Sequence, residues 1–236
     1  MKSTLVTSIT LLGLASARAT PRDVPIRILP RNWKFEITSL KGPGCPDFGL
    51  PDGNDRHTRL TYGSNTMDGS EIYYWFIAYP SLRVELGETE STWCETELQY
   101  TEYKDTVGGI EGEDYRLRLH KNGTQVISTY DIDSDVEATF SFKYLDADIT
   151  DTYTLRGPAA SGQYQKQIGM VASKPYPPYK EPKCGAAKLK FRTELKIGGT
   201  GKKGVVDSEH STDKDGKVQY YGTQLGFSYD WEKCEE

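Results

Sequence analysis

The sequence predicts one all-β domain, a single antiparallel β-sandwich of jelly-roll-like form that carries two disulfides. Three observations favour this fold class: apolar and polar residues alternate in many separate segments, turn-forming residues lie between them, and no segment shows a sustained helical period with a cap. Strands separated by turns favour an antiparallel sandwich over a parallel sheet with crossover helices. The 236 residues suit one such domain, because all-β sandwiches commonly reach about 200–250 residues.

Period-two alternation predicts the main strands. Four segments are apolar on one face only, and these are residues 32–40, 136–144, 188–197 and 225–231. A strand of this kind buries one face and leaves the other in solvent. Residues 71–79 (EIYYWFIAY) are apolar on both faces, which predicts a central strand.

A β-hairpin is predicted around Asn122-Gly123. Residues 115–119 lead into this dipeptide, and residues 125–130 form the return strand. Asn-Gly suits a tight turn because both residues accept a positive φ. Continued alternation then places His120 on the outward face beside the arginines of the first strand, so His120 is expected at the surface.

Two further segments interrupt the strand pattern. Residues 175–179 (PYPPY) are expected to connect the two sheets, with an interdomain linker as the alternative. The connection is favoured because the few strands between Cys184 and Cys234 would make a thin core alone. Residues 198–204 (GGTGKKG) are expected to form a flexible loop with solvated lysines.

Residues 1–19 have the layout of a secretory signal peptide. A positive start is followed by a short apolar stretch, Leu5–Leu14, and then by small residues, so cleavage is expected after Ala17 or Ala19. The apolar stretch is shorter than the roughly 20 residues that cross a bilayer. We therefore expect residues 20–236 to be a secreted, extracellular domain with no membrane span.

The cysteines agree with export. Cys45, Cys94, Cys184 and Cys234 are even in number, far apart, and not in a C-x-x-C spacing. In an oxidising compartment they are expected to form two disulfides. Of the three possible pairings we favour Cys45–Cys94 with Cys184–Cys234, because each pair then ties one half of the chain.

A glycan is predicted on Asn122. The triplet Asn122-Gly123-Thr124 is the only N-x-[ST] sequon of the chain. On the predicted hairpin, this glycan would sit at the tip.

The charge balance argues against nucleic acid as a partner. The chain has 29 Lys and Arg against 34 Asp and Glu, a formal net charge of −5. A phosphate-binding surface needs a net-basic face.

Alternating aspartates offer calcium candidates. Asp131, Asp133 and Asp135 stand just before a predicted strand, and calcium takes 6–8 oxygen ligands of this type. No EF-hand loop is completed, because no Glu falls at its final position. A solvated acidic loop is therefore favoured, and neither a metal nor a cofactor is expected.

No catalytic motif is recognised in the sequence. H-E-x-x-H and G-x-S-x-G are absent, and the glycine-rich segment 198–204 does not fit a phosphate-binding loop. Paired cysteines provide no nucleophile. A carboxylate pair for glycoside hydrolysis stays open, because the sequence does not single out two residues among 34 acidic ones. A non-enzymatic protein is expected.

Aromatic residues are the remaining clue to binding. They cluster in the first half (Tyr73, Tyr74, Trp75, Tyr79, Trp93, Tyr100, Tyr103) and again later (Tyr176, Tyr179, Tyr220, Tyr221). Alternation buries about half of them. Those left outside would stack on sugars or anchor a protein partner, since Tyr and Trp give large rigid contacts. Core packing is the plainer interpretation of any single one.

Several motifs, taken in order, resemble a known family. These are Gly42-Pro43-Gly44-Cys45-Pro46, Cys94 followed by Glu95-Thr96-Glu97-Leu98, the acidic turn before Val136, Gly157-Pro158, Cys184-Gly185, Asp207-Ser208 and Trp231-x-x-Cys234. The order is similar to a secreted family of filamentous ascomycete fungi catalogued as domain of unknown function 4360. The resemblance covers about residues 33–234 and implies a secreted fungal β-protein. It brings no catalytic residues. Some such proteins of plant-associated fungi act as effectors.

The first functional hypothesis is a secreted, non-enzymatic binding protein. It would be a candidate fungal effector, and hence a virulence factor, that acts in the extracellular space on a host protein, for example by inhibiting a host hydrolase or protease. The alternative is a carbohydrate-binding or carbohydrate-active protein whose partner is a cell-wall polysaccharide. A structural cell-wall protein is the third possibility, because the fold alone does not fix the function.

Overall fold

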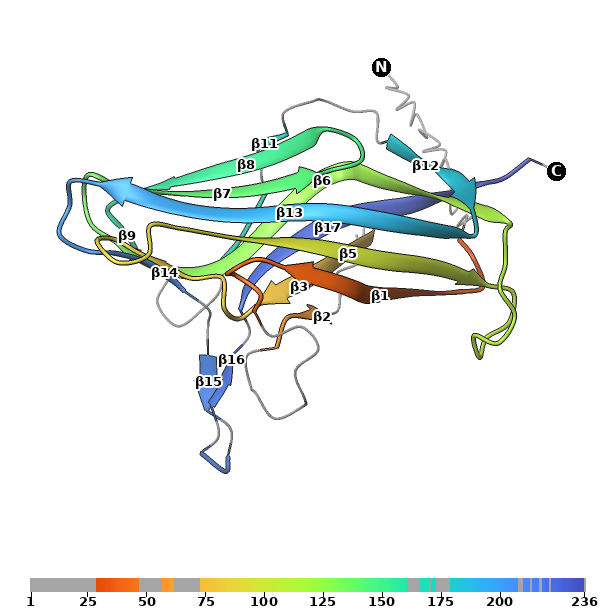
Figure 1. Cartoon of the computed structure of the whole chain (residues 1–236), viewed down its shortest axis with the longest axis horizontal. Coiled ribbons are helices and arrows are strands. Elements are labelled where there is room, and N and C mark those ends of the chain that lie inside the picture. Colours follow the sequence, from red (N-terminus) through yellow and green to blue (C-terminus); the bar gives the residue numbers. More distant parts are fainter. Residues whose placement is uncertain are drawn as a thin grey trace, which may run out of the picture.

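The structure is a computed structural model that describes residues 29–46, 57–61, 73–160, 166–169, 171–172, 179–207, 210–212, 214–216, 218–220 and 222–235. Two antiparallel sheets pack face to face (Figure 1), which confirms the all-β sandwich. The predicted signal peptide and the proline-rich residues 175–178 lie outside the described residues.

The first sheet has six strands in the order β1-β5-β13-β7-β8-β11. Their bounds are β1 (Asn32–Lys41), β5 (Ser91–Tyr103), β13 (Ala186–Gly199), β7 (Val136–Tyr144), β8 (Ile149–Arg156) and β11 (Val171–Ala172). The alternation predicted for 136–144 and 188–197 is confirmed, because β7 and β13 bury every second residue. β5 buries every second residue from Thr92 to Glu102 in the same way. The one-faced strand predicted for 225–231 is wrong, because every residue from Leu225 to Trp231 is buried.

The second sheet is built around β6 (Tyr115–Ile132), in the order β2-β3-β17-β6-β14-β4. The other strands are β2 (Arg59–Thr61), β3 (Tyr73–Tyr79), β17 (Thr223–Lys233), β14 (Gly204–Asp207) and β4 (Val84–Glu85). Along one edge of β6, β17 pairs first and β14 takes over at Thr129. Three short strands pair with the other edge: β12 (Tyr179–Cys184), β10 (Lys166–Gly169) and β9 (Ala159–Ala160).

A small separate hairpin, β15 (His210–Thr212) with β16 (Val218–Tyr220), projects from the body of the sandwich (Figure 1).

The core between the sheets is aromatic. The Phe35 ring of the first sheet lies 5.6 Å from the Phe227 ring and 5.2 Å from the Tyr229 ring of the second. The Trp231 indole donates its Nε1 hydrogen to the Tyr100 hydroxyl at 2.9 Å across the same interface. Aromatic pairs bury large areas in defined geometries, so these contacts fix how the two sheets sit on each other.

The predicted hairpin at Asn122-Gly123 is wrong. β6 runs through the dipeptide as one strand, and β17 pairs with it on both sides. Leu119 pairs with Tyr229 and Thr124 pairs with Phe227, so four residues of β6 stand opposite one residue of β17. This is an enlarged β-bulge, and Gly123 adopts φ 69° within it. The positive φ that Asn-Gly tolerates here absorbs extra residues instead of reversing the chain.

Candidate interaction surface

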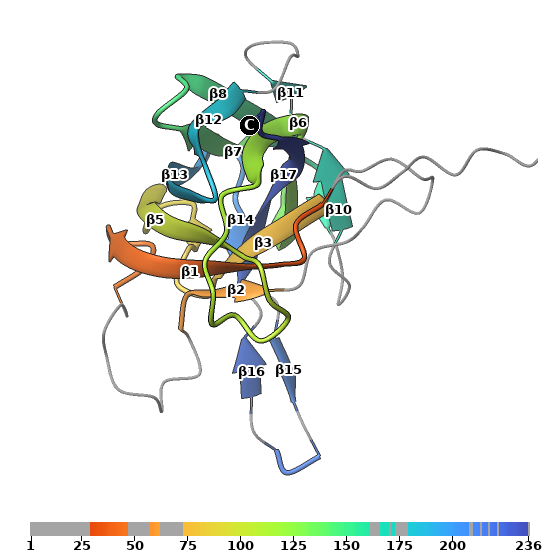
Figure 2. The same cartoon turned by 90° about the vertical axis from the view of Figure 1, so that its right-hand side faces the viewer.

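The segment 104–114, which joins β5 to β6, presents the most exposed large apolar side chains of the described residues. Val107 is 87% exposed and Ile110 is 60% exposed. We call these two residues the apolar tip. The segment projects at the end of the sandwich that also carries the C-terminus (Figure 2). Two exposed apolar side chains on one projecting loop make a candidate contact surface.

The outer half of this loop is held by hydrogen bonds among its own residues. The Asp105 carboxylate accepts hydrogen bonds from the backbone N–H groups of Gly108 and Gly109 at 2.9 and 3.0 Å. The Lys104 N–H donates to the Ile110 carbonyl at 2.8 Å. Gly108 has φ 79°, a conformation that favours glycine. The tip is therefore held in one shape by bonds that require Asp105 and Gly108.

The base of the loop is fixed by Glu102, a carboxylate that is only 1% exposed. Its two oxygens accept hydrogen bonds from the backbone N–H groups of Tyr115 at 2.9 Å and Asp114 at 3.2 Å. The Glu102 N–H donates to the Gly185 carbonyl at 2.6 Å. Burial raises the pKa of the Glu102 carboxyl, and these hydrogen bonds oppose the rise only in part. The loop is thus anchored in the core of the first sheet.

Acidic residues surround the tip. The segment 104–114 contains one lysine and four carboxylates, Asp105, Glu111, Glu113 and Asp114, so its formal charge is −3. Glu111, Glu113 and Asp114 are exposed. The surface is an apolar contact with an acidic rim, which is the anatomy of a protein-binding epitope.

Of the aromatic residues that the sequence offers for binding, three are buried. Tyr74, Tyr79 and Tyr100 are buried, and burial raises the pKa of Tyr79 to about 12. Trp93 faces outward, but the Arg192 guanidinium lies over its ring at 4.2 Å. The side chains of Tyr73, Tyr176, Tyr179, Tyr220 and Tyr221 lie outside the described residues. Packing in the interior is therefore confirmed for Tyr74, Tyr79 and Tyr100.

The calcium candidates do not converge on one point. Asp131 pairs with Lys203, and the Asp133 N–H donates to the Lys203 carbonyl at 2.9 Å. Asp135 lies at the mouth of a separate groove. Within the described ranges, no group of three or more His, Cys, Asp or Glu side chains is placed to hold a metal ion.

The glycine-rich segment 198–204 packs closely against the turn that precedes β7. A Cβ on Gly199 would lie 2.0 Å from the Asp135 carbonyl oxygen, and one on Gly201 would lie 2.5 Å from that of Ser134. The Thr200 N–H also donates to the Asp135 carbonyl at 3.0 Å. The glycines therefore allow two backbones to approach closely. From the sequence alone, these glycines indicate a flexible loop.

An open groove of about 560 Å³ lies on the outer face where β7 and β13 meet. Its polar lining includes Asp135, Glu137, Thr139, Lys196 and Thr200. A Cβ on Gly198 would meet nothing within 4 Å. The missing side chain at this position helps to leave the groove open, and the lining offers hydrogen-bonding groups of both polarities.

Sequence reasoning missed a buried acid–imidazole pair. The His120 Nε2 atom lies 2.9 Å from both carboxylate oxygens of Asp151, and both side chains are buried between the sheets. The prediction of a surface His120 is therefore wrong. The bulge in β6 gives His120 φ 64° and turns its side chain inward. A bulge resets the two-residue period, so alternation counted from Arg116 fails at this point.

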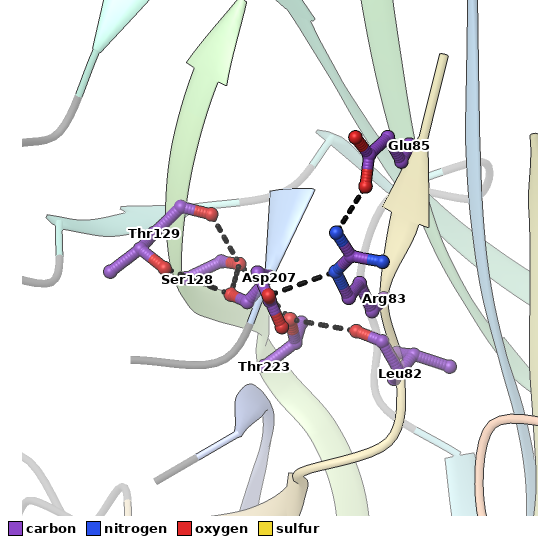
Figure 3. Close-up of polar contacts among 7 residues, drawn as sticks. All are labelled: Leu82, Arg83, Glu85, Ser128, Thr129, Asp207 and Thr223. Atoms are coloured by element: carbon purple, nitrogen blue, oxygen red, sulfur yellow. Dashed lines mark hydrogen bonds and ion pairs between the residues drawn. The ribbon is translucent and has the colours of Figure 1, made fainter. Parts of the chain in front are cut away.

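A second polar cluster closes the place where β14 replaces β17 beside β6 (Figure 3). Arg83 bridges Asp207 at 2.9 Å and Glu85. The Thr129 hydroxyl donates to the Asp207 carbonyl at 3.0 Å, and the Ser128 and Thr223 hydroxyls lie 3.0 Å apart. The polar groups drawn satisfy one another, which is typical of a structural joint.

The structure also places the predicted disulfide cysteines and the predicted glycosylation residue. The structure pairs Cys45 with Cys94 and Cys184 with Cys234, which confirms the favoured connectivity. Asn122 is exposed on the bulge of β6, and its backbone N–H donates to the Ser228 hydroxyl at 2.9 Å. Glycosylation of Asn122 stays a prediction. Disulfides of this kind are consistent with an extracellular protein.

Comparisons with known proteins returned nothing: no family model, no curated protein and no solved structure matches this chain. The resemblance to the ascomycete family therefore stays a prediction. None of the described segments is a helix long and apolar enough to cross a membrane.

Proposed function

We propose that this chain is a secreted, non-enzymatic binding protein that recognises an extracellular host protein through the apolar tip. The observation that carries the proposal is the exposure of Val107 and Ile110 on a loop whose backbone is hydrogen-bonded at both its outer half and its base. A pre-shaped loop binds without a large ordering cost, so its apolar side chains act as anchors. The two disulfides support an extracellular setting.

The same surface supports an effector role. An acidic loop with an apolar tip is suited to a basic protein surface that holds a hydrophobic pocket. A host hydrolase or protease with such a surface would be blocked by the rigid loop. This part of the proposal also relies on the resemblance to secreted fungal proteins.

Capture from host extracellular fluid tests this function. The oxidised mature protein is immobilised beside two variants, Val107→Ser/Ile110→Ser and the control Leu145→Ser. Leu145 is an exposed leucine on another turn. We expect one protein to be retained by the wild type and the control, with at least about 30-fold weaker binding to the tip variant, as loss of a hot spot of about 2 kcal/mol predicts.

The result that contradicts the proposal is capture of the same proteins by the tip variant and the wild type. A retained protease or glycanase is then assayed for inhibition by the wild type and by the tip variant.

Carbohydrate binding is the second candidate, and the groove between β7 and β13 favours it. Its acidic, hydroxyl and ammonium groups suit sugar hydroxyls. Gly198→Leu fills the groove without meeting another atom at Cβ. We expect this variant to lose binding on a panel of chitin, glucan and plant wall polymers, while the tip variant keeps it. Equal binding by wild type and Gly198→Leu removes this candidate.

A further inference from the structure

A cavity of about 290 Å³ opens beside the Cys184–Cys234 disulfide. Its lining consists of Arg116, Cys184, Glu232, Lys233, Cys234 and Glu235. Cys184 and Cys234 are half-buried. By contrast, Cys45 is 2% exposed and Cys94 is fully buried. We call this cavity the exchange pocket.

The strand register brings three of the pocket residues, Arg116, Cys184 and Glu232, onto one face of the sheet. Arg116 of β6 stands directly opposite Cys184 of β12 on one side and Glu232 of β17 on the other. Residues directly opposite each other share a face of the sheet. Leu117, the next residue along β6, is buried in the core, so Arg116 belongs to the outward face. The disulfide therefore faces a cavity and not the aromatic core.

Arg116 contributes a group that lacks a partner. Its Nε atom is buried, and it has no hydrogen-bond partner in the part of the chain that the structure describes. A buried donor without a partner is costly, and a guanidinium recognises carboxylates with particular strength. Because the Arg116 guanidinium also lines the cavity, the lining points to a ligand that carries a carboxylate.

The charges of the pocket define the ligand further. Two cations, Arg116 and Lys233, share the lining with two carboxylates, Glu232 and Glu235. The Glu232 carboxylate also lies 3.9 Å from the Arg118 guanidinium. A ligand with carboxylates and an ammonium group matches this set better than a simple anion does, because each of its charges meets an opposite one.

We propose that the exchange pocket binds a small zwitterionic thiol and that the Cys184–Cys234 disulfide exchanges with it. The ligand thiolate attacks the Sγ atom of one cysteine, the S–S bond breaks, and the other cysteine leaves as a thiolate that takes a proton from water. The product is a mixed disulfide and one free thiol, so no separate oxidant or reductant is needed. Arg116, on the same face as Cys184, stabilises the departing thiolate.

The consequence is a modifiable link between two strands. In the disulfide form, β12 and the end of β17 are tied together across β6. The mixed disulfide removes this tie while Cys45–Cys94 stays intact in the core. The inference is independent of the proposed partner and of the apolar tip.

The test uses the oxidised full chain with glutathione as the zwitterionic probe and 2-mercaptoethanol as the neutral one. Rates of mixed-disulfide formation are normalised to the thiolate concentration of each probe, and peptide mapping locates the adduct. We expect adducts on Cys184 or Cys234 before any on Cys45 or Cys94. We also expect glutathione to react at least about tenfold faster than 2-mercaptoethanol, as one charge-assisted hydrogen bond allows.

The variants separate docking from simple exposure. Arg116→Gln is expected to slow glutathione about tenfold and to leave the 2-mercaptoethanol rate within about twofold. Lys233→Gln is expected to act in the same direction from an exposed position, should Arg116→Gln fold poorly. Lys190→Gln, on the outer face of the first sheet, is the control for net charge. Equal normalised rates for the two thiols, unchanged glutathione rates in both pocket variants, or earlier reaction at Cys45–Cys94 would each overturn the proposal.

Discussion

The two disulfides close loops of nearly the same length but lie in opposite surroundings. Cys45 and Cys94 are 49 residues apart, and Cys184 and Cys234 are 50 residues apart. The chain-entropy model gives each link about 4 kcal/mol from loop closure alone. Any difference between them must therefore come from their neighbours, which makes the pair an internal comparison of a buried and an exposed cross-link.

The register places the two links at opposite ends of the sandwich. Cys94 pairs with Thr193 of β13, nine residues along the chain from Cys184. The seven-residue separation between Ala186, where β13 begins, and Thr193 spans about 23 Å at about 3.3 Å per residue. Cys45–Cys94 is part of the hydrophobic core, whereas Cys184–Cys234 borders the exchange pocket. The same covalent bond thus serves as core packing at one end and as a surface tie at the other.

Removal of each disulfide is expected to give the largest effects. Cys184→Ala/Cys234→Ala should lose about 4 kcal/mol of unfolding free energy through loop entropy. Cys45→Ala/Cys94→Ala should lose about 1–3 kcal/mol more, because it also leaves a cavity in the core. Urea unfolding of the wild type and both variants measures this. Equal losses would show that burial adds nothing to the link.

Substitution of the glycines beside the cysteines should destabilise the protein more at the Cys184–Cys234 end than at the Cys45–Cys94 end. This is the reverse of the order expected for removal of the disulfides. Gly185 has φ 80°, and its Cβ would lie 2.0 Å from the Gly112 carbonyl oxygen. A Cβ on Gly44 would lie 2.4 Å from the flexible end of the Leu82 side chain. We expect Gly185→Ala to cost about 3 kcal/mol and Gly44→Ala about half of that. Thermal unfolding compares the two, and a larger loss for Gly44→Ala would contradict this assignment of strain.

The stability of the end of the sandwich that carries Cys184–Cys234 should also depend on pH, through the buried Glu102. Burial raises the pKa of this carboxyl in the folded chain above its usual value. Its protonated form is therefore favoured by folding, and its contribution to stability is greatest at low pH and declines as pH rises through the raised pKa. Relative to Glu102→Gln, the wild type should lose stability as the pH rises from the usual pKa of a glutamate toward the raised pKa of Glu102.

Unfolding of these two proteins across that range, with Glu113→Gln as the exposed control, measures the difference. A wild type that gains stability relative to Glu102→Gln as the pH rises would contradict this assignment.

The smallest effect is expected on the solvated face next to Cys94. The Arg192 guanidinium lies 2.8 Å from the Glu95 carboxylate, and about a third of each side chain is exposed. Pairs of this kind contribute about 0.2–1 kcal/mol. A double-mutant cycle with Arg192→Gln and Glu95→Gln should give a coupling in this range that shrinks in high salt. A coupling above about 2 kcal/mol would mean that this face is functionally desolvated.

Much of the fold was predictable because it rests on local patterns. Strands such as β7 and β13 are set by alternation that the packed sheet preserves. The sequence left three cysteine pairings open, and the structure has the favoured one. The bulge of β6 was not predictable in this way. Asn122-Gly123 fits a turn and a bulge equally well, and only the distant strand β17, which pairs on both sides of it, selects the bulge.

The candidate surface was less accessible to sequence reasoning. Val107 and Ile110 were available as a signal, because apolar residues inside a glycine-rich acidic segment have no strand to bury them. Their exposure depends on Glu102, near the end of β5, and on Gly185, between β12 and β13, which anchor the base of the loop. Likewise, the His120 side chain turns inward because the bulge shifts the two-residue alternation of β6, and the residues near His120 give no sign of this shift.

The central strand of the second sheet sets a limit on the order of folding. Among the described strands, every partner of β6 lies further along the chain, and the longest one, β17, begins 91 residues after β6 ends. During synthesis, β6 emerges long before these partners exist, whereas β7 and β8 pair across a short turn at once. Long-range pairing of this kind is slow and leaves apolar edges open in the meantime. A newly made chain will therefore need shielding of β6 until residues 223–233 arrive.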